Sequence, residues 1–136
     1  MSERNIEIVR GGAEALATGD VEALMPFVHP EFEMTTTPDI ASEPDTYRGT
    51  DGVRRYFDSF YEAMDGIRVE PGEFIAVGEL VVVPFTLRAR GRTTGIEASQ
   101  PAVQVWELRG EQAFRLSLFA ELEDAMAFAR ERAGQS

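Results

Sequence analysis

The sequence has no cysteine and no lysine, and only one histidine, His29, among its 136 residues. Without cysteine the chain has no disulfide bond and no thiolate nucleophile, and without lysine it cannot form a Schiff base through its own side chain. A metal site would depend almost entirely on carboxylates, because other protein ligands are nearly absent. No spacing of acidic residues suggests such a site, so we predict neither a metal ion nor another cofactor.

Positive charge is also scarce, since 13 basic residues, all arginine, stand against 24 acidic residues and give a net charge of −11. This charge disfavours nucleic acid, whose phosphates require a basic face. No apolar run reaches the roughly 18 residues that a membrane span requires, and the polar start is unlike a secretory signal. We therefore expect a single cytoplasmic domain over residues 1–136 that binds neither nucleic acid nor membrane.

Helical patterns come first along the chain and strand patterns follow. Apolar spacing predicts helices over residues 2–19 and 20–30, the second ended by His29 and Pro30, and a third, strongly amphipathic helix from Thr50 or Asp51 to Gly66. A brief strand over 32–36 separates the second and third helices. The order ααβαββββα favours an α+β domain. Further strands are expected over 68–77, 80–90, 94–108 and 113–119, with a last helix from Leu122.

The sequence motifs at these boundaries resemble those of the SnoaL-like family of the NTF2-like superfamily, which is related to steroid delta-isomerases and polyketide cyclases. The matching segments are Gly19-Asp20, His29–Glu33, Tyr47–Val53 and Val105–Gly110. The resemblance implies a cone: a strongly curved, mostly antiparallel sheet packed on the N-terminal helices, with an apolar cavity open at one end. Members include isomerases, cyclases, epoxide hydrolases, dehydratases and plain binding domains, so the fold alone does not imply an activity.

The resemblance also implies where catalytic groups would stand. The steroid isomerase donor tyrosine, base and protonated acid correspond to Gly12, Thr36 and Val103, none of which has the required group. The epoxide hydrolase pattern places two aspartates about an arginine, and the long predicted strands contain no aspartate. Neither reaction is therefore expected, and the sequence leaves open whether the protein is an enzyme.

The third helix supplies the first candidates for a ligand site. Its apolar face should point Tyr56, Phe57 and Phe60 inward, and Thr36, at the end of the short strand, should also face inward. Tyr56 is interpreted either as a hydroxyl for a ligand or as a core residue whose hydroxyl reaches the rim. Asp39, the carboxylate nearest to Thr36, is a further candidate.

The longest predicted strand supplies a second group, whose role depends on which face is concave. Gln100, Gln104 and Trp106 share one face, and Val103 and Val105 share the other. The first set forms polar anchors of a ligand site if its face is concave, and a subunit contact if it is convex. Because the valines are apolar enough to line a cavity, we favour the subunit contact and expect a homodimer. Gln100, Val103, Gln104 and Trp106 all remain ligand-binding candidates.

Two kinds of function fit these observations. The first is a protein that binds a small apolar or aromatic molecule in a conical pocket, either sequestering it or acting as a cofactor-independent cyclase, isomerase or hydratase. The second is a non-catalytic binding or assembly domain that works through the sheet surface of its dimer. Trp106 distinguishes them, since it belongs to the pocket in one case and to the subunit contact in the other.

Overall fold

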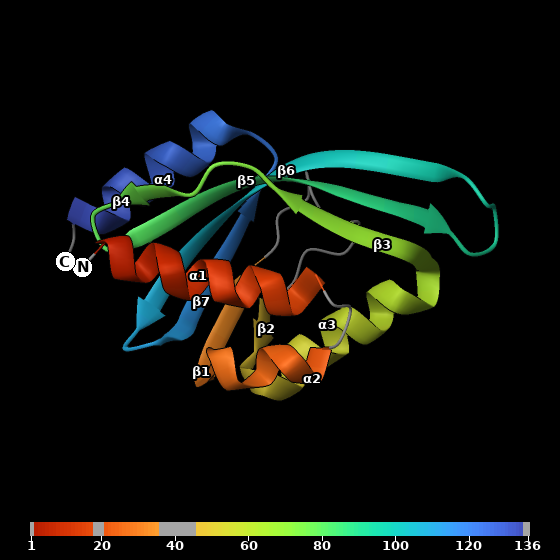
Figure 1. Ribbon diagram of the computed structural model, residues 1–136, viewed down its shortest axis with the longest axis horizontal. Coiled ribbons are helices and arrows are strands. Elements are labelled where there is room, and N and C mark those ends of the chain that lie inside the picture. Colours follow the sequence, from red (N-terminus) through yellow and green to blue (C-terminus); the bar gives the residue numbers. More distant parts are fainter. Residues whose placement is uncertain (1, 18–20, 36–45, 135–136) are drawn as a thin grey trace.

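The computed structural model describes residues 2–17, 21–35 and 46–134, which form a curved sheet with helices on both faces (Figure 1). None of the described helices is long and apolar enough to span a bilayer. The helices are α1 (Ser2–Ala17), α2 (Val21–Leu24), the 3-10 turn η1 (Met25–Phe27), α3 (Gly49–Ala63) and α4 (Leu122–Gly134). The strands are β1 (Val28–Thr35), β2 (Thr46–Arg48), β3 (Met64–Pro71), β4 (Ile75–Val77), β5 (Leu80–Gly91), β6 (Glu97–Arg109) and β7 (Gln112–Phe119).

The strands lie in the order β2-β1-β7-β6-β5-β3, and β4 also pairs with β5. Strands β1 and β7 are parallel, and the remaining neighbours are antiparallel. Strand β3 pairs with the later half of β5, and β4 pairs with its start. The result is the α+β fold with a strongly curved, mostly antiparallel sheet that the sequence predicts, and the order of elements agrees in outline.

Several boundaries differ from the prediction for local reasons. The expected strand over 68–77 is two strands, β3 and β4, and β3 already begins at Met64, where a helix end was expected. The unpredicted β2 is only three residues long, too short to show a period. His29 and Pro30 belong to β1, not to a helix. The β1–β7 register shifts between Val28 and Glu33, so Pro30, which has no N–H to donate, falls where the ladder is irregular.

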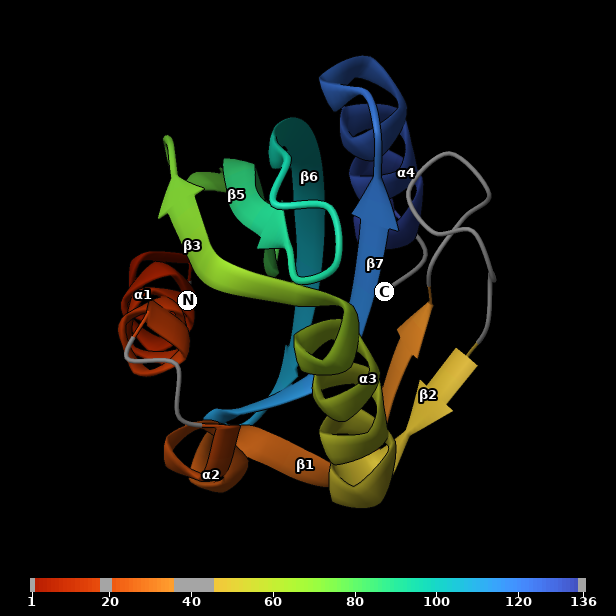
Figure 2. The same cartoon turned by 90° about the vertical axis from the view of Figure 1, so that its right-hand side faces the viewer.

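The concave face of the sheet and the N-terminal helices enclose the main core (Figure 2). Val9 of α1 and Val53 of α3 are buried against sheet residues such as Val81, Val83 and Trp106. The second glycine of the Tyr47–Val53 segment, Gly52, explains how α3 approaches the sheet so closely. A Cβ at Gly52 would lie 2.9 Å from the carbonyl carbon of Tyr47, so the first turn of α3 packs on the backbone of β2.

Helix α4 covers the convex face with a second buried cluster. Its Ala125 and Ala129 are fully buried against Val103 and Val105 of β6. Residues 80–83 of β5 are buried in succession because both faces of that strand are covered. The expectation that Val103 and Val105 face the cavity is therefore wrong, and the second apolar face is buried within the chain by α4.

Candidate functional site

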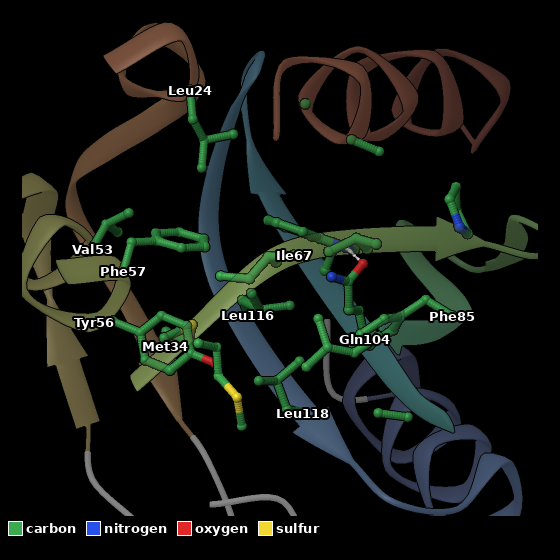
Figure 3. A pocket seen from close by; sticks show the side chains of 18 of the residues that line it. Leu24, Met34, Val53, Tyr56, Phe57, Ile67, Phe85, Gln104, Leu116 and Leu118 are labelled. Carbon is green, nitrogen blue, oxygen red and sulfur yellow. Dashed lines mark hydrogen bonds between the residues drawn. The ribbon is translucent and has the colours of Figure 1, made fainter. Parts of the chain in front are cut away.

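A cavity of about 370 Å³ lies between the concave face of the sheet and helices α1, α2 and α3 (Figure 3). Among the residues that line it, Gly66, Pro71, Arg92 and Gln100 are exposed, whereas Val28 and Phe32 are buried. Gly66 and Arg92 mark an open mouth at the start of β3 and the end of β5, and Val28 and Phe32 mark a closed floor near the start of β1. Its volume falls within the range of about 300–1,000 Å³ that is typical of small-molecule sites.

The walls of the cavity are mainly apolar. The helical side and η1 contribute Leu24, Phe27, Val53 and Phe57, and the sheet contributes apolar side chains from every long strand. The strand residues of this kind are Val28, Phe32 and Met34 of β1, Met64, Ile67, Val69 and Pro71 of β3, Phe85 and Leu87 of β5, Ala102 and Trp106 of β6, and Leu116 and Leu118 of β7.

Gln104 is the half-buried polar side chain on the sheet side of the cavity, and its orientation is fixed by Trp106. The indole Nε1–H of Trp106 donates a hydrogen bond to Gln104 Oε1 at 3.0 Å (Figure 3). Since an indole nitrogen can only donate, the carbonyl end of the amide must face Trp106, and the NH₂ end has no acceptor among the described residues. The cavity thus contains an amide donor that is held in place from one side.

Trp106 is itself positioned by an aromatic contact that depends on a glycine. The ring of Phe27 stands edge-on to that of Trp106, with centroids 5.6 Å apart. A Cβ at Gly12 would lie 2.7 Å from Phe27 Cε1, so α1 leaves room for this ring only because residue 12 has no side chain. Gly12, Phe27, Trp106 and Gln104 form one line of contacts across the cavity wall.

Tyr56 extends from α3 toward the cavity on the side opposite Gln104 (Figure 3). Its ring packs edge-on against Tyr47 and Phe57, with centroid distances of 5.2 and 5.3 Å. Burial, and to a smaller extent the neighbouring Tyr47, raises the pKa of the Tyr56 hydroxyl. The phenol is therefore neutral at physiological pH and acts in the cavity as a hydrogen-bonding group, not as a phenolate base.

Asp65 and Arg92 are the charged residues of the described cavity lining, and both lie at the mouth. Arg90 Nε donates to Asp65 Oδ1 at 3.1 Å, and Arg92 Nη1 lies 3.9 Å from Asp65 Oδ2. The sequence prediction missed Asp65 because it ended the third helix at Gly66, and it missed Arg92 because this residue falls between the strands expected over 80–90 and 94–108. The alternation of Ile67 and Val69 with charged residues, followed back toward Met64, is the signal that would have placed Asp65 at a strand start.

The structure brings together Tyr56, Phe57, Gln100, Gln104 and Trp106 as lining residues of one cavity. The interpretation of Gln100, Gln104 and Trp106 as a subunit contact is therefore wrong, because their face of β6 is the concave one. The reason is that the face of β6 with Val103 and Val105 packs against α4 and does not line the cavity.

The remaining candidates do not join this group. Val103 packs under α4, and the neighbours on either side of it, Ala102 and Gln104, line the cavity without supplying a carboxylic acid. Thr36 and Asp39 lie outside the described residues, as does the side chain of Phe60.

His29 lies outside the described lining of the cavity and has a local role. Its Nδ1 accepts a hydrogen bond from the backbone N–H of Glu31 at 2.9 Å, and its ring stands edge-on to Phe114 at 5.2 Å. Within residues 2–17, 21–35 and 46–134, no three potential ligands from His, Asp or Glu are grouped to hold a metal ion.

Comparison with known proteins places this geometry in a family. The SnoaL-like domain family matches residues 9–116. No curated protein matches the chain.

Solved structures of similar fold cover almost the whole chain. An NTF2-like protein of unknown function from Burkholderia pseudomallei has 23% identity and a TM-score of 0.76, over 91% of this chain and 95% of its own. TerC, co-crystallised with polyporic acid, has 24% identity and a TM-score of 0.77, over 94% and 98%. SalBIII, an epoxide hydrolase/cyclase-like enzyme in pyran ring formation in the polyether salinomycin, has 22% identity and a TM-score of 0.73, over 90% and 94%. At these identities the likeness concerns the fold.

Proposed function

The chain belongs to the SnoaL-like domain family, and from that premise we propose that it binds a small, mainly apolar molecule whose carbonyl-type oxygen accepts a hydrogen bond from Gln104. The observation that carries this proposal is the 3.0 Å hydrogen bond from Trp106 to the carbonyl end of Gln104. It turns the amide NH₂ toward an apolar space, where a missing acceptor is costly and a ligand oxygen is correspondingly favoured. Tyr56, on the opposite wall, is a second hydrogen-bonding group for the same molecule.

The same arrangement favours polarisation of the bound carbonyl. A fixed donor in a cavity of low polarity stabilises negative charge on oxygen more than the same donor in water. This property suits a cofactor-independent cyclisation, isomerisation or hydration, and the polyporic acid co-crystallised with TerC supports a small organic ligand. The carboxylate of the described lining, Asp65, stands at the mouth beside Arg90, so the cavity favours binding and polarisation over proton abstraction at its floor.

A pair of matched probes tests the role of Gln104. 2-Acetylnaphthalene and 2-ethylnaphthalene have the same skeleton, and only the first has an acceptor oxygen. We expect the ketone-to-hydrocarbon affinity ratio to fall about fivefold in Gln104→Leu, as the loss of about one hydrogen bond predicts. The emission of Trp106, the single tryptophan, provides the binding signal.

Gln112→Leu is the control, because it makes the same chemical change at a glutamine that lies outside the described lining and donates to the Pro26 carbonyl. This variant should keep the wild-type ratio. A ratio that is unchanged in Gln104→Leu, or no binding of either probe to the wild-type protein, would contradict the proposal.

A further inference from the structure

The mouth of the cavity differs in chemistry from its walls. Its lining residues include one cation, Arg92, and one carboxylate, Asp65, whereas the rest of the described lining is uncharged. We infer that the mouth recognises an acidic group, an inference that rests on the proposed ligand site. The ligand is then an amphipathic anion with its apolar body in the cavity and a carboxylate or sulfonate beside Arg92.

The pairing of Asp65 permits this role for Arg92. Arg90, the cross-strand neighbour of Asp65 on β5, holds Oδ1 at 3.1 Å, whereas Arg92 approaches Oδ2 only to 3.9 Å. Arg90 therefore keeps Asp65 paired when the Arg92 guanidinium turns to a ligand. Glu97, which lies opposite Arg90 on β6, does not belong to the described lining.

The exposure of Arg92 and the net charge of the protein both support an acid-binding role for this arginine. The Arg92 side chain is 51% exposed, so an acid held there keeps part of its hydration while the apolar body leaves water. A guanidinium presents several N–H donors in a plane that matches a carboxylate or sulfonate. The protein as a whole has a net charge of −11 and repels anions at long range, so the capture of an acid depends on a local cation at the entrance.

Two dyes that differ by one acidic group provide the test. 1-Anilinonaphthalene-8-sulfonate carries a sulfonate, and N-phenyl-1-naphthylamine is the same skeleton without it. We expect Arg92→Gln to weaken sulfonate-dye binding about tenfold, as the loss of a charge-assisted contact predicts, and to leave the neutral dye unchanged. Arg92→Glu should weaken the sulfonate dye further.

Arg68→Gln is the matched control. Arg68 is an exposed arginine on β3 that faces Arg88 across the sheet and does not belong to the described lining, so both dyes should bind this variant as they bind the wild type.

The outcomes separate this inference from the proposed function. If Arg92→Gln leaves the sulfonate dye unchanged, or weakens both dyes equally, or if Arg68→Gln has the same effect, the acidic-group inference is wrong while neutral-dye binding still supports an apolar ligand site. If the wild-type protein binds neither dye, the proposed ligand site and the acidic-group inference are both contradicted. Thermal unfolding of each variant confirms that the folded protein is being compared.

Discussion

Gly11 and Gly12 are neighbours on α1 with opposite surroundings. A Cβ at Gly11 would meet nothing within 4 Å, whereas a Cβ at Gly12 would lie 2.7 Å from Phe27 Cε1. Because Phe27 packs on Trp106, the space at residue 12 controls the wall of the cavity and not only the stability of a helix.

Alanine substitutions at the two glycines should therefore have opposite effects. Gly11→Ala should stabilise the protein by about 0.5–1 kcal/mol, because glycine is a poor helix former. Gly12→Ala should destabilise it by about 1–3 kcal/mol, since the Phe27 ring must move. Urea unfolding followed by circular dichroism measures both. The fluorescence emission of Trp106 should change only in Gly12→Ala. Equal stabilisation by the two substitutions would show that the Phe27 ring can move aside without a cost in free energy.

At the scale of the elements, the position of α4 decides which face of the sheet is free for a ligand. Ala125 and Ala129 are fully buried on the convex side, and Arg132 Nη2 lies 2.9 Å from Glu107 Oε1 of β6 near the end of the helix. Among the described residues, the main core cluster on the concave side includes none from α4.

Leucine substitutions on the two sides of α4 test this arrangement. Ala129→Leu should cost about 1–3 kcal/mol of unfolding free energy because the buried site has no room for the larger side chain. Ala127→Leu, on the exposed side of the same helix, should stay within about 0.5 kcal/mol of the wild type. Chemical unfolding measures the difference. Folded Ala129→Leu should still bind the neutral dye as the wild type does, and a loss of dye binding would mean that the two faces are coupled.

The elements that the sequence predicted well are those with a clear period. Helix α3 repeats its apolar residues at helical spacing, and each of the turns that join β4, β5, β6 and β7 contains glycine. The concave face of β6 could not be predicted, because Trp106 on one side and Val105 on the other are both apolar, and both are buried, one in each cluster. Asp65 was missed for a related reason: its strand follows α3 directly, so the helical pattern masks the strand start.

At the scale of the whole molecule, the absence of lysine and cysteine leaves few groups that titrate in alkali. The three tyrosines are the side chains whose ordinary pKa lies between about 9 and 11, since arginine stays charged there. The stability of the protein in this range therefore reports on its tyrosines to an extent that is unusual for a domain of this size.

Tyr56 should make the folded protein sensitive to alkali above about pH 10. Burial, and then Tyr47, raises its pKa from an ordinary value of 10.0, so the unfolded chain loses this proton at a lower pH than the folded chain does. The stability that the neutral phenol contributes is fully present below the unfolded pKa and is lost as the pH rises through the folded pKa. The unfolding free energy of the wild type should thus fall more steeply than that of Tyr56→Phe above pH 10, by at most about 1.4 kcal/mol per pH unit. Urea unfolding at half-unit steps from pH 8 to about pH 11 measures both curves. Parallel curves would mean that the Tyr56 hydroxyl is as well hydrated as in the unfolded chain, and the phenol would then belong to the rim of the cavity and not to its wall.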